Sequence, residues 1–157
     1  MPPKKPKDPM NDLTIASAFR AVNNANQNVP ANTFVKVLYQ TKQFDLANEY
    51  NAANSTFSPN KNGVYLISGT ISFSSNNPNV NYRARVEIRV NGNPAIAIDN
   101  DFFGQINFGN VVNVSTIFNL KAHDKVEIFA QSSTAGVIAQ NINGVSSTHL
   151  EAARFPS

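Results

Sequence analysis

The chain has 157 residues, of which 41% are hydrophobic and 15% charged, with a formal net charge of +3 and no cysteine. This size and composition are typical of one globular domain and exclude a disordered chain, a disulfide framework and a thiolate metal site. The thinly spread charge argues against nucleic-acid binding, because neutralising phosphates takes a clustered basic face.

The first residues differ in composition from the rest. Residues 1–12 are rich in proline and lysine and lack an apolar period, so we expect a flexible arm followed by one domain over residues 13–157. No apolar segment follows the basic residues of the arm, so no signal peptide is visible. The sequence also has no apolar run of membrane-spanning length.

Short alternating runs separated by turn residues fill the domain, which is typical of an antiparallel sandwich or barrel. The first two predicted strands are residues 16–22 and 33–40. The clearest is residues 82–90, where apolar side chains alternate with charged ones, and Asn91-Gly92 then predicts a two-residue hairpin turn. Further strands are predicted within 110–120, 126–131 and 147–156. No stretch has a helical period, so the predicted class is all-β.

The charged side of the 82–90 strand is a candidate ligand patch. Arg83, Arg85 and Arg89 alternate along it with Glu87. A solvated outer sheet face is the favoured interpretation. The alternative is a patch for an anionic ligand, made stronger by display on several copies.

Asp99 and Asp101 are the candidate metal ligands, because carboxylates are the hard oxygen donors that Ca²⁺ prefers. The loop does not fit a calcium-hand pattern, since Phe103 takes a ligand place and Asn110 stands where a bidentate glutamate is needed. A solvated acidic turn is favoured over a looser calcium site, and no other cofactor is expected. Phe102, Phe103, Ile106 and Phe108 are expected to be buried at the end of the sandwich or in a contact between copies rather than to form an exposed tip.

The two histidines offer little for catalysis. His123 is expected in a turn, because histidine tolerates positive φ better than most residues, and His149 is expected as a packed or exposed polar residue of the last strand. No Gly-x-Ser-x-Gly elbow accompanies them, so a hydrolase is only a remote alternative.

A set of spacings connects the middle of the chain to a known family. Tyr39, Asp45, Tyr50, Phe57 and then Gly63 with Tyr65 fall at intervals of six, five, seven, six and two. The set resembles the aromatic, Asn or Asp, aromatic, Phe, Gly-x-Tyr signature of the complement C1q / tumour necrosis factor superfamily. "LKAHDKVEIFAQ" and the closing "THLEAARF" also resemble family segments. The asparagine-rich composition is most similar to that of bacterial C1q-like domains at the tips of collagen-like spore-surface filaments.

The resemblance implies a ten-stranded jelly-roll sandwich that assembles as a homotrimer. The residues expected to pack at the trimer interface are Tyr39, Tyr50, Phe57, Tyr65 and Phe155. Asp45 and Gly63 are expected to serve the fold, Gly63 as a sharp turn into its strand.

The function that follows is a non-enzymatic head domain for surface recognition or for assembly of a larger surface protein. Its expected location is extracellular, or on a spore, cell or virion surface, and its ligand a cell-surface, glycan or anionic group. The alternative is a purely structural cap that trimerises a spore-surface or virion fibre and binds nothing itself.

Overall fold

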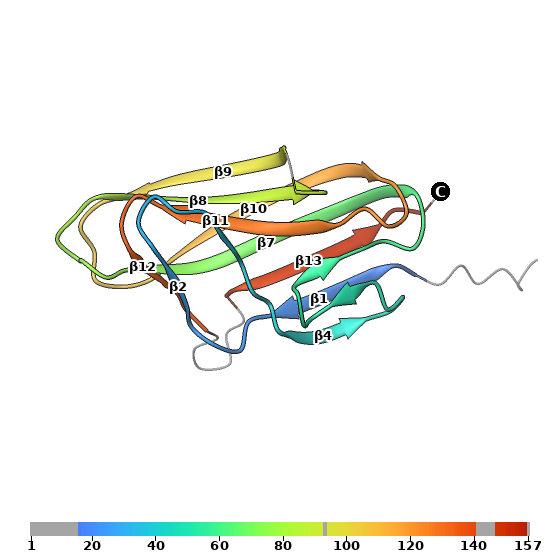
Figure 1. The fold of residues 1–157 in the computed structure, drawn as a ribbon, viewed down its shortest axis with the longest axis horizontal. Helices are drawn as coiled ribbons and strands as arrows, with labels where there is room; N and C mark the ends of the chain where they lie inside the picture. The colour runs from blue at the N-terminus through green and yellow to red at the C-terminus, as the bar shows by residue number, and fades with distance from the viewer. Residues whose placement is uncertain (1–15, 93, 141–146, 157) are drawn as a thin grey trace, which may run out of the picture.

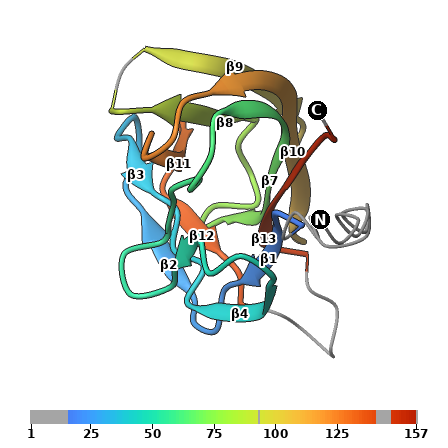
Figure 2. The same ribbon diagram turned by 90° about the vertical axis from the view of Figure 1, so that its right-hand side faces the viewer.

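The computed structural model describes residues 16–92, 94–140 and 147–156. In these ranges the chain forms thirteen strands and no helix, arranged as two antiparallel sheets that face each other (Figures 1 and 2). No helix that could cross a membrane therefore occurs in the described ranges. The predicted arm, residues 1–12, lies outside them.

The first sheet has seven strands in the order β2-β12-β7-β13-β1-β4, with β10 on the other edge of β7. Its strands are β1 Ala18–Val22, β2 Gln27–Val29, β4 Thr41–Asp45, β7 Gly63–Ser75, β10 Asn110–Leu120, β12 Gly136–Ile138 and β13 His149–Arg154.

The second sheet has six strands in the order β5-β6-β11-β8-β9, with β3 paired to β11. Its strands are β3 Val35–Lys36, β5 Tyr50–Asn51, β6 Thr56–Phe57, β8 Tyr82–Val90, β9 Ala95–Phe103 and β11 Val126–Ser132. Strands of two or three residues raise the number above the ten predicted.

The hairpin between β8 and β9 forms as predicted. Asn91 and Gly92 have φ of 54° and 88°, the left-handed values that a two-residue turn of this type requires. The strand predicted over 33–40 is reduced to β3. The backbone beyond β3 bonds elsewhere, because the N–H of Leu38 donates to Gln27 Oε1 and that of Tyr39 to Ser55 Oγ.

An aromatic cluster fills one part of the space between the sheets. The ring of Phe19 stacks on Tyr50 at 4.6 Å and lies 4.8 Å from Phe57, which in turn lies 5.7 Å from Tyr65. Tyr39 O–H donates to the carbonyl of Thr70 in the first sheet. Each buried ring contributes about 2–3 kcal/mol, so the spaced aromatics hold the two sheets together.

The chain enters and leaves the sandwich at the same end. Ala18 at the start of β1 pairs with Ala153 near the end of β13, and Figure 1 shows the C-terminus at this end. At the opposite end, the ring of Tyr82 at the start of β8 packs 5.5 Å from Phe73. We call these the entry end and the far end.

Candidate functional site

The outward side of the first sheet carries an exposed apolar surface. Ile117 on β10 lies opposite Leu66 on β7, Leu66 opposite Ala153 on β13, and Ala153 opposite Ala18 on β1. Other exposed apolar side chains adjoin this row. We call the whole set the assembly face; its residues are Ala18, Phe44, Leu46, Val64, Leu66, Ile117, Ala153 and Phe155.

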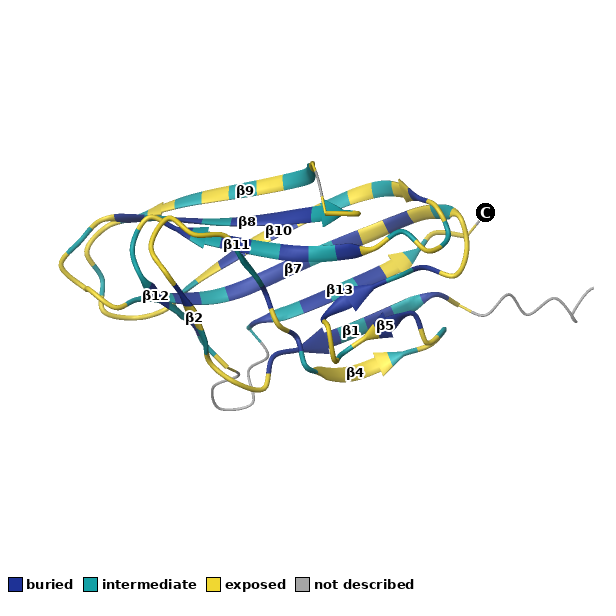
Figure 3. Ribbon diagram, in the orientation of Figure 1, coloured by how far each residue is buried: buried dark blue, intermediate teal, exposed yellow. Residues whose placement is uncertain are grey.

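The register and the surface shape show that these side chains adjoin. A hollow of about 170 Å³ is lined in part by Ala18, Phe44, Leu66 and Ala153. Leu66 is 43% exposed and Ile117 61% exposed, and Figure 3 shows the bands of exposure along β10 and β4. Contiguous exposed apolar surface of this kind marks an interaction site in soluble proteins.

A polar row borders the assembly face farther along the same strands. Asn113 Nδ2 donates to Thr70 Oγ1 at 2.6 Å, and Thr70 Oγ1 lies 3.3 Å from His149 Nε2. Arg20 and Glu151 form an ion pair of 3.1 Å between this polar row and the assembly face. These groups give the sheet a mixed outward surface with its apolar part toward the entry end.

The residues predicted for the trimer interface are mostly elsewhere. Tyr39, Tyr50, Phe57 and Tyr65 are all at most 4% exposed in the single chain, so they have no surface left for a neighbour. For these four the prediction is wrong, because they point between the sheets and fill the core. Phe155 is exposed beside Val64, whose carbonyl accepts its N–H, and its place at an interface stays a prediction.

Apart from Phe155, sequence reasoning missed the residues that line the assembly face. Alternation along residues 63–68 carried the signal, because Val64 and Leu66 lie in opposite phase to Tyr65 and Ile67. Both phases of this strand are apolar, and a strand with two apolar faces needs a second cover.

The two residues expected to serve the fold have different roles. Asp45 accepts hydrogen bonds from the N–H groups of Glu49 and Tyr50, at 3.0 and 3.1 Å, and so closes the loop before β5. Gly63 is the first residue of β7 and is not among the residues with positive φ. The turn explanation is therefore wrong; a Cβ there would lie 3.0 Å from Arg154 Cδ, so close packing explains the glycine.

The arginine stripe on β8 is not the solvated face that was favoured. Glu87 is buried, and its two oxygens accept from Arg85 Nε at 2.7 Å and Arg89 Nε at 2.8 Å. The Arg89 guanidinium also lies 4.1 Å from the ring centroid of Phe129 and 4.7 Å from that of Phe34. Arg85 and Arg89 are therefore held in place, and Arg83 stands apart from them.

The two candidate calcium ligands lie on β9. Asp99 pairs with Val86 and Asp101 with Ala84, so both side chains are on the same side of the strand. Burial and the charge of Asp99 raise the pKa of Asp101. Within the described ranges no three His, Asp or Glu side chains come together as a metal site. Two carboxylates are fewer than the six to eight oxygens that calcium takes, and calcium binding stays a prediction.

His123 has a φ of 70° in the turn before β11, which confirms the prediction for this residue. The four apolar residues after Asp101 divide into two groups. Phe103 and Ile106 pack partly buried against the core. Phe102 and Phe108 are 79% and 64% exposed, so for these two burial at the end of the sandwich is wrong, and burial in a contact between copies stays a prediction.

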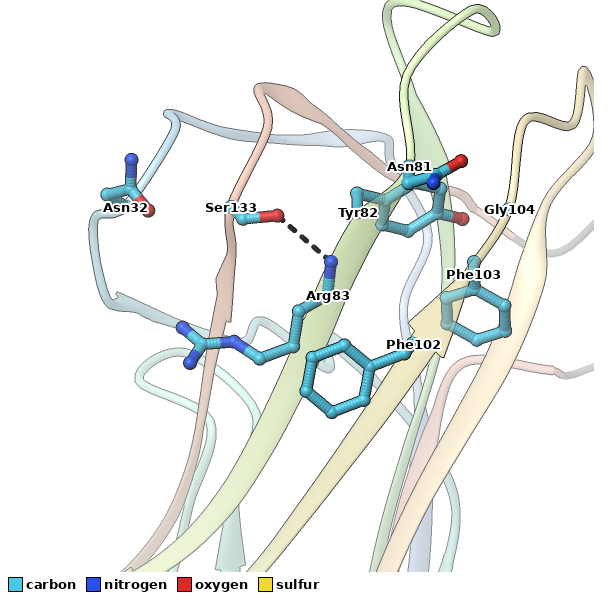
Figure 4. A pocket seen from close by; sticks show the side chains of 8 residues that line it. All are labelled: Asn32, Asn81, Tyr82, Arg83, Phe102, Phe103, Gly104 and Ser133. Atoms are coloured by element: carbon cyan, nitrogen blue, oxygen red, sulfur yellow. Dashed lines mark hydrogen bonds between the residues drawn. The ribbon is translucent and has the colours of Figure 1, made fainter.

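Phe102 lines an open groove at the far end of the second sheet (Figure 4). The groove has a volume of about 650 Å³. Its walls come from four segments of the chain, and its lining residues are Asn32, Asn81, Tyr82, Arg83, Phe102, Phe103, Gly104 and Ser133. We call it the far-end groove.

Known structures share this arrangement over most of the chain. Murine APRIL superposes with a TM-score of 0.64 and 12% identity, over 89% of this chain and 99% of the other. An Eiger TNF from S. frugiperda superposes with a TM-score of 0.60 and 9% identity, over 90% and 94%. The globular domain of zebrafish complement 1qA protein does so with a TM-score of 0.52 and 16% identity, over 87% and 93%.

This chain has the C1q/TNF-like fold. The two packed sheets and their coverage of nearly the whole length of these structures establish the jelly roll that the resemblance to the superfamily implied. No family profile and no curated protein sequence matches the chain. Within the C1q/TNF-like fold, the assembly face lies on the outward side of the sheet that contains β10, β7, β13 and β1.

Proposed function

We propose that this chain is a non-enzymatic head domain that forms a homotrimer through the assembly face and serves recognition at a surface. The observation that carries the proposal is the exposed row of Ile117, Leu66, Ala153 and Ala18. The occupant that fits it is a second copy of this chain, because the resemblance of the aromatic set to the C1q/TNF superfamily implies three copies about one axis.

The energetics favour a permanent assembly. Each large apolar side chain that leaves water contributes about 1.5–3 kcal/mol, and the assembly face offers several such side chains per chain. The edge strands β9 and β10 belong to different sheets and leave edges that a neighbour would cover. Recognition would then use the loops and the second sheet, with weak sites strengthened by display in three copies.

Sedimentation equilibrium tests the proposal. We expect a mass about three times the 17.1 kDa of one chain at micromolar concentration. Leu66→Asp places a charge in the apolar contact at a cost of several kcal/mol, so this variant is expected to sediment as a monomer with its sandwich intact by circular dichroism.

Phe108→Asp is the matched control. It introduces the same charge at an apolar side chain that is also exposed but lies in the loop between β9 and β10. The control is expected to remain trimeric. A wild-type chain that stays monomeric at micromolar concentration, or a Leu66→Asp variant that stays trimeric, overturns the proposed assembly.

A further inference from the structure

Arg83 is the arginine of β8 whose charge is not balanced within the fold. Arg85 and Arg89 both pair with Glu87, whereas no carboxylate in the described ranges forms an ion pair with Arg83. Its Nη2 donates to Gln131 Oε1 at 2.8 Å, and its Nε is buried without a hydrogen-bond partner. The backbone N–H of Arg83 donates to Ser133 Oγ at 2.9 Å, which fixes the strand beside the groove.

The aromatic ring of Phe102 lies on the neighbouring strand, beside the aliphatic part of the Arg83 side chain (Figure 4). Phe102 on β9 is the register partner of Arg83, so both side chains extend from the outward side of the second sheet, as Figure 4 shows. The phenyl ring is 79% exposed, so its face is accessible to a ligand. Gly104 follows, where an added Cβ would meet no atom within 4 Å, so this side of the groove is open.

Two carboxamides complete the lining. The side chains of Asn32 and Asn81 make no hydrogen bond within the described ranges, and both line the groove. Each carboxamide can donate and accept at the same time. The backbone of Asn32 is held in place, because its N–H donates to the carbonyl of Ser132 and its own carbonyl accepts from Gln131 Nε2.

We propose that the far-end groove binds a carboxylated sugar. The guanidinium of Arg83 pairs with the carboxylate, the ring of Phe102 packs against the C–H face of the pyranose, and the amides of Asn32 and Asn81 bond its hydroxyl groups. The assignment deepens the recognition part of the proposed function and rests on it only for the gain from three-fold display.

The composition of the groove selects this ligand class. One unbalanced cation suits one negative charge, whereas phosphorylated ligands favour several cationic or backbone donors. The exposed ring suits a ligand with a flat apolar face, which a simple anion lacks. The two amides suit groups that both donate and accept, as sugar hydroxyls do.

Saturation-transfer NMR with glucuronic acid tests the assignment. Because the groove is open, we expect weak binding, with a Kd of about 1 mM. Arg83→Gln and Phe102→Ala are each expected to weaken binding about tenfold or more, since one removes the charge-assisted pair and the other the stacking surface. The methyl ester of glucuronic acid, which keeps the ring and loses the charge, is expected to bind about as weakly as the Arg83→Gln variant binds the acid.

Lys121→Gln and Phe108→Ala are the matched controls, because they remove one positive charge and one exposed ring outside the groove. Both are expected to bind like the wild type. No binding of glucuronic acid, equal binding of its methyl ester, equal competition by acetate, or unchanged binding by Arg83→Gln overturns the assignment. If Arg83→Gln fails to fold, Arg83→Lys is the second variant, because it keeps the charge and removes the planar guanidinium. Weakened binding is expected, and unchanged binding overturns the assignment of the carboxylate to the guanidinium.

The molecular mass of the protein in each sample is measured by sedimentation equilibrium in parallel with the NMR binding experiment. Binding by a monomer leaves the groove assignment standing and overturns the trimer alone. A trimer that does not bind overturns the groove alone. Loss of the trimer in Phe102→Ala without loss of binding shows that Phe102 belongs to an interface between chains, and overturns its role in the groove.

Discussion

Across the described strands, the two sheets share one alternating pattern and use their outward positions in opposite ways. The outward side of β7 and β10 carries Leu66 and Ile117, which remain largely exposed among the described residues. The outward side of β8 carries charges that are internally balanced, because buried Glu87 accepts from both Arg85 and Arg89. The ring of Phe34 then lies over these arginines.

The contrast distinguishes a surface whose polar and aromatic groups are already paired within the chain from one that gains stability when a partner covers it. A face whose charges and rings are already paired has little to gain from a partner. A face with large apolar side chains in water gains about 25 cal/mol for each Å² that a partner covers. The assembly face is therefore the one that favours association, and the middle of β8 is closed except at Arg83.

The largest expected effect is the separation of the two sheets at high pH, which abolishes the difference between their outward sides. Burial raises the pKa of Tyr50 to about 12 and also raises the pKa values of Tyr39 and Tyr65. The folded state thus keeps these protons at a pH where the unfolded chain has lost them, so the contribution of these tyrosines to stability is constant below about pH 10 and falls above it.

We expect tyrosinate absorbance at 295 nm to rise together with loss of the β-sheet signal in circular dichroism, in one transition above about pH 10. This transition would separate the two sheets and expose the inner sides on which they pack. Tyrosinate that forms for all four tyrosines while the sheet signal is unchanged would contradict the burial on which this prediction depends.

A single substitution is expected to disrupt the charge pairing on the outward side of the second sheet and to leave the first sheet unchanged. Glu87→Gln leaves Arg85 and Arg89 without their buried carboxylate, and we expect the free energy of unfolding to fall by about 2–3 kcal/mol. Urea denaturation measures it.

Glu151→Gln is the matched change on the first sheet. Its pair with Arg20 is more open, with side chains 43% and 26% exposed, and exposed pairs contribute at most about 1 kcal/mol. Equal losses for the two variants would show that the two faces do not differ in this way.

The smallest predicted effect concerns the ring that covers the arginines. Phe34→Leu keeps an apolar side chain and removes the cation–π contacts with Arg85 and Arg89, so we expect a loss of about 1 kcal/mol by urea denaturation. Phe108→Leu, at a ring more exposed than that of Phe34, is expected to change stability by much less. A Phe34→Leu variant as stable as the wild type would mean that the ring is not part of the paired surface.

Local patterns were enough to predict the fold but not whether each residue lies in the core or on the surface. Alternation and the Asn91-Gly92 turn predicted β8 and its hairpin, since both depend on neighbours in sequence. The spacing of Tyr50, Phe57 and Tyr65 indicated one interlocking set. It did not tell whether that set lies within one chain or between chains, because either location requires apolar residues in the same phase.

Non-local contacts decided the rest. Glu87 is buried because Phe34, more than fifty positions earlier, lies over its arginine partners. Gly69 lies on β7 where a Cβ would be 2.6 Å from the side chain of Ile128, so a larger residue has no room at this position. The far-end groove joins Asn32, Arg83, Phe102 and Ser133, which no sequence spacing connects.

The common position of both chain ends has a mechanical consequence. The thirteen residues of β7 extend about 43 Å at 3.3 Å per residue, which approximates the distance from the entry end to the far-end groove. Tension between a ligand in that groove and whatever precedes residue 16 acts along β1. The backbone bonds of β1 to β13 on one side and β4 on the other are then stretched in shear, all together rather than one after another. A strand held in this way resists extraction under force.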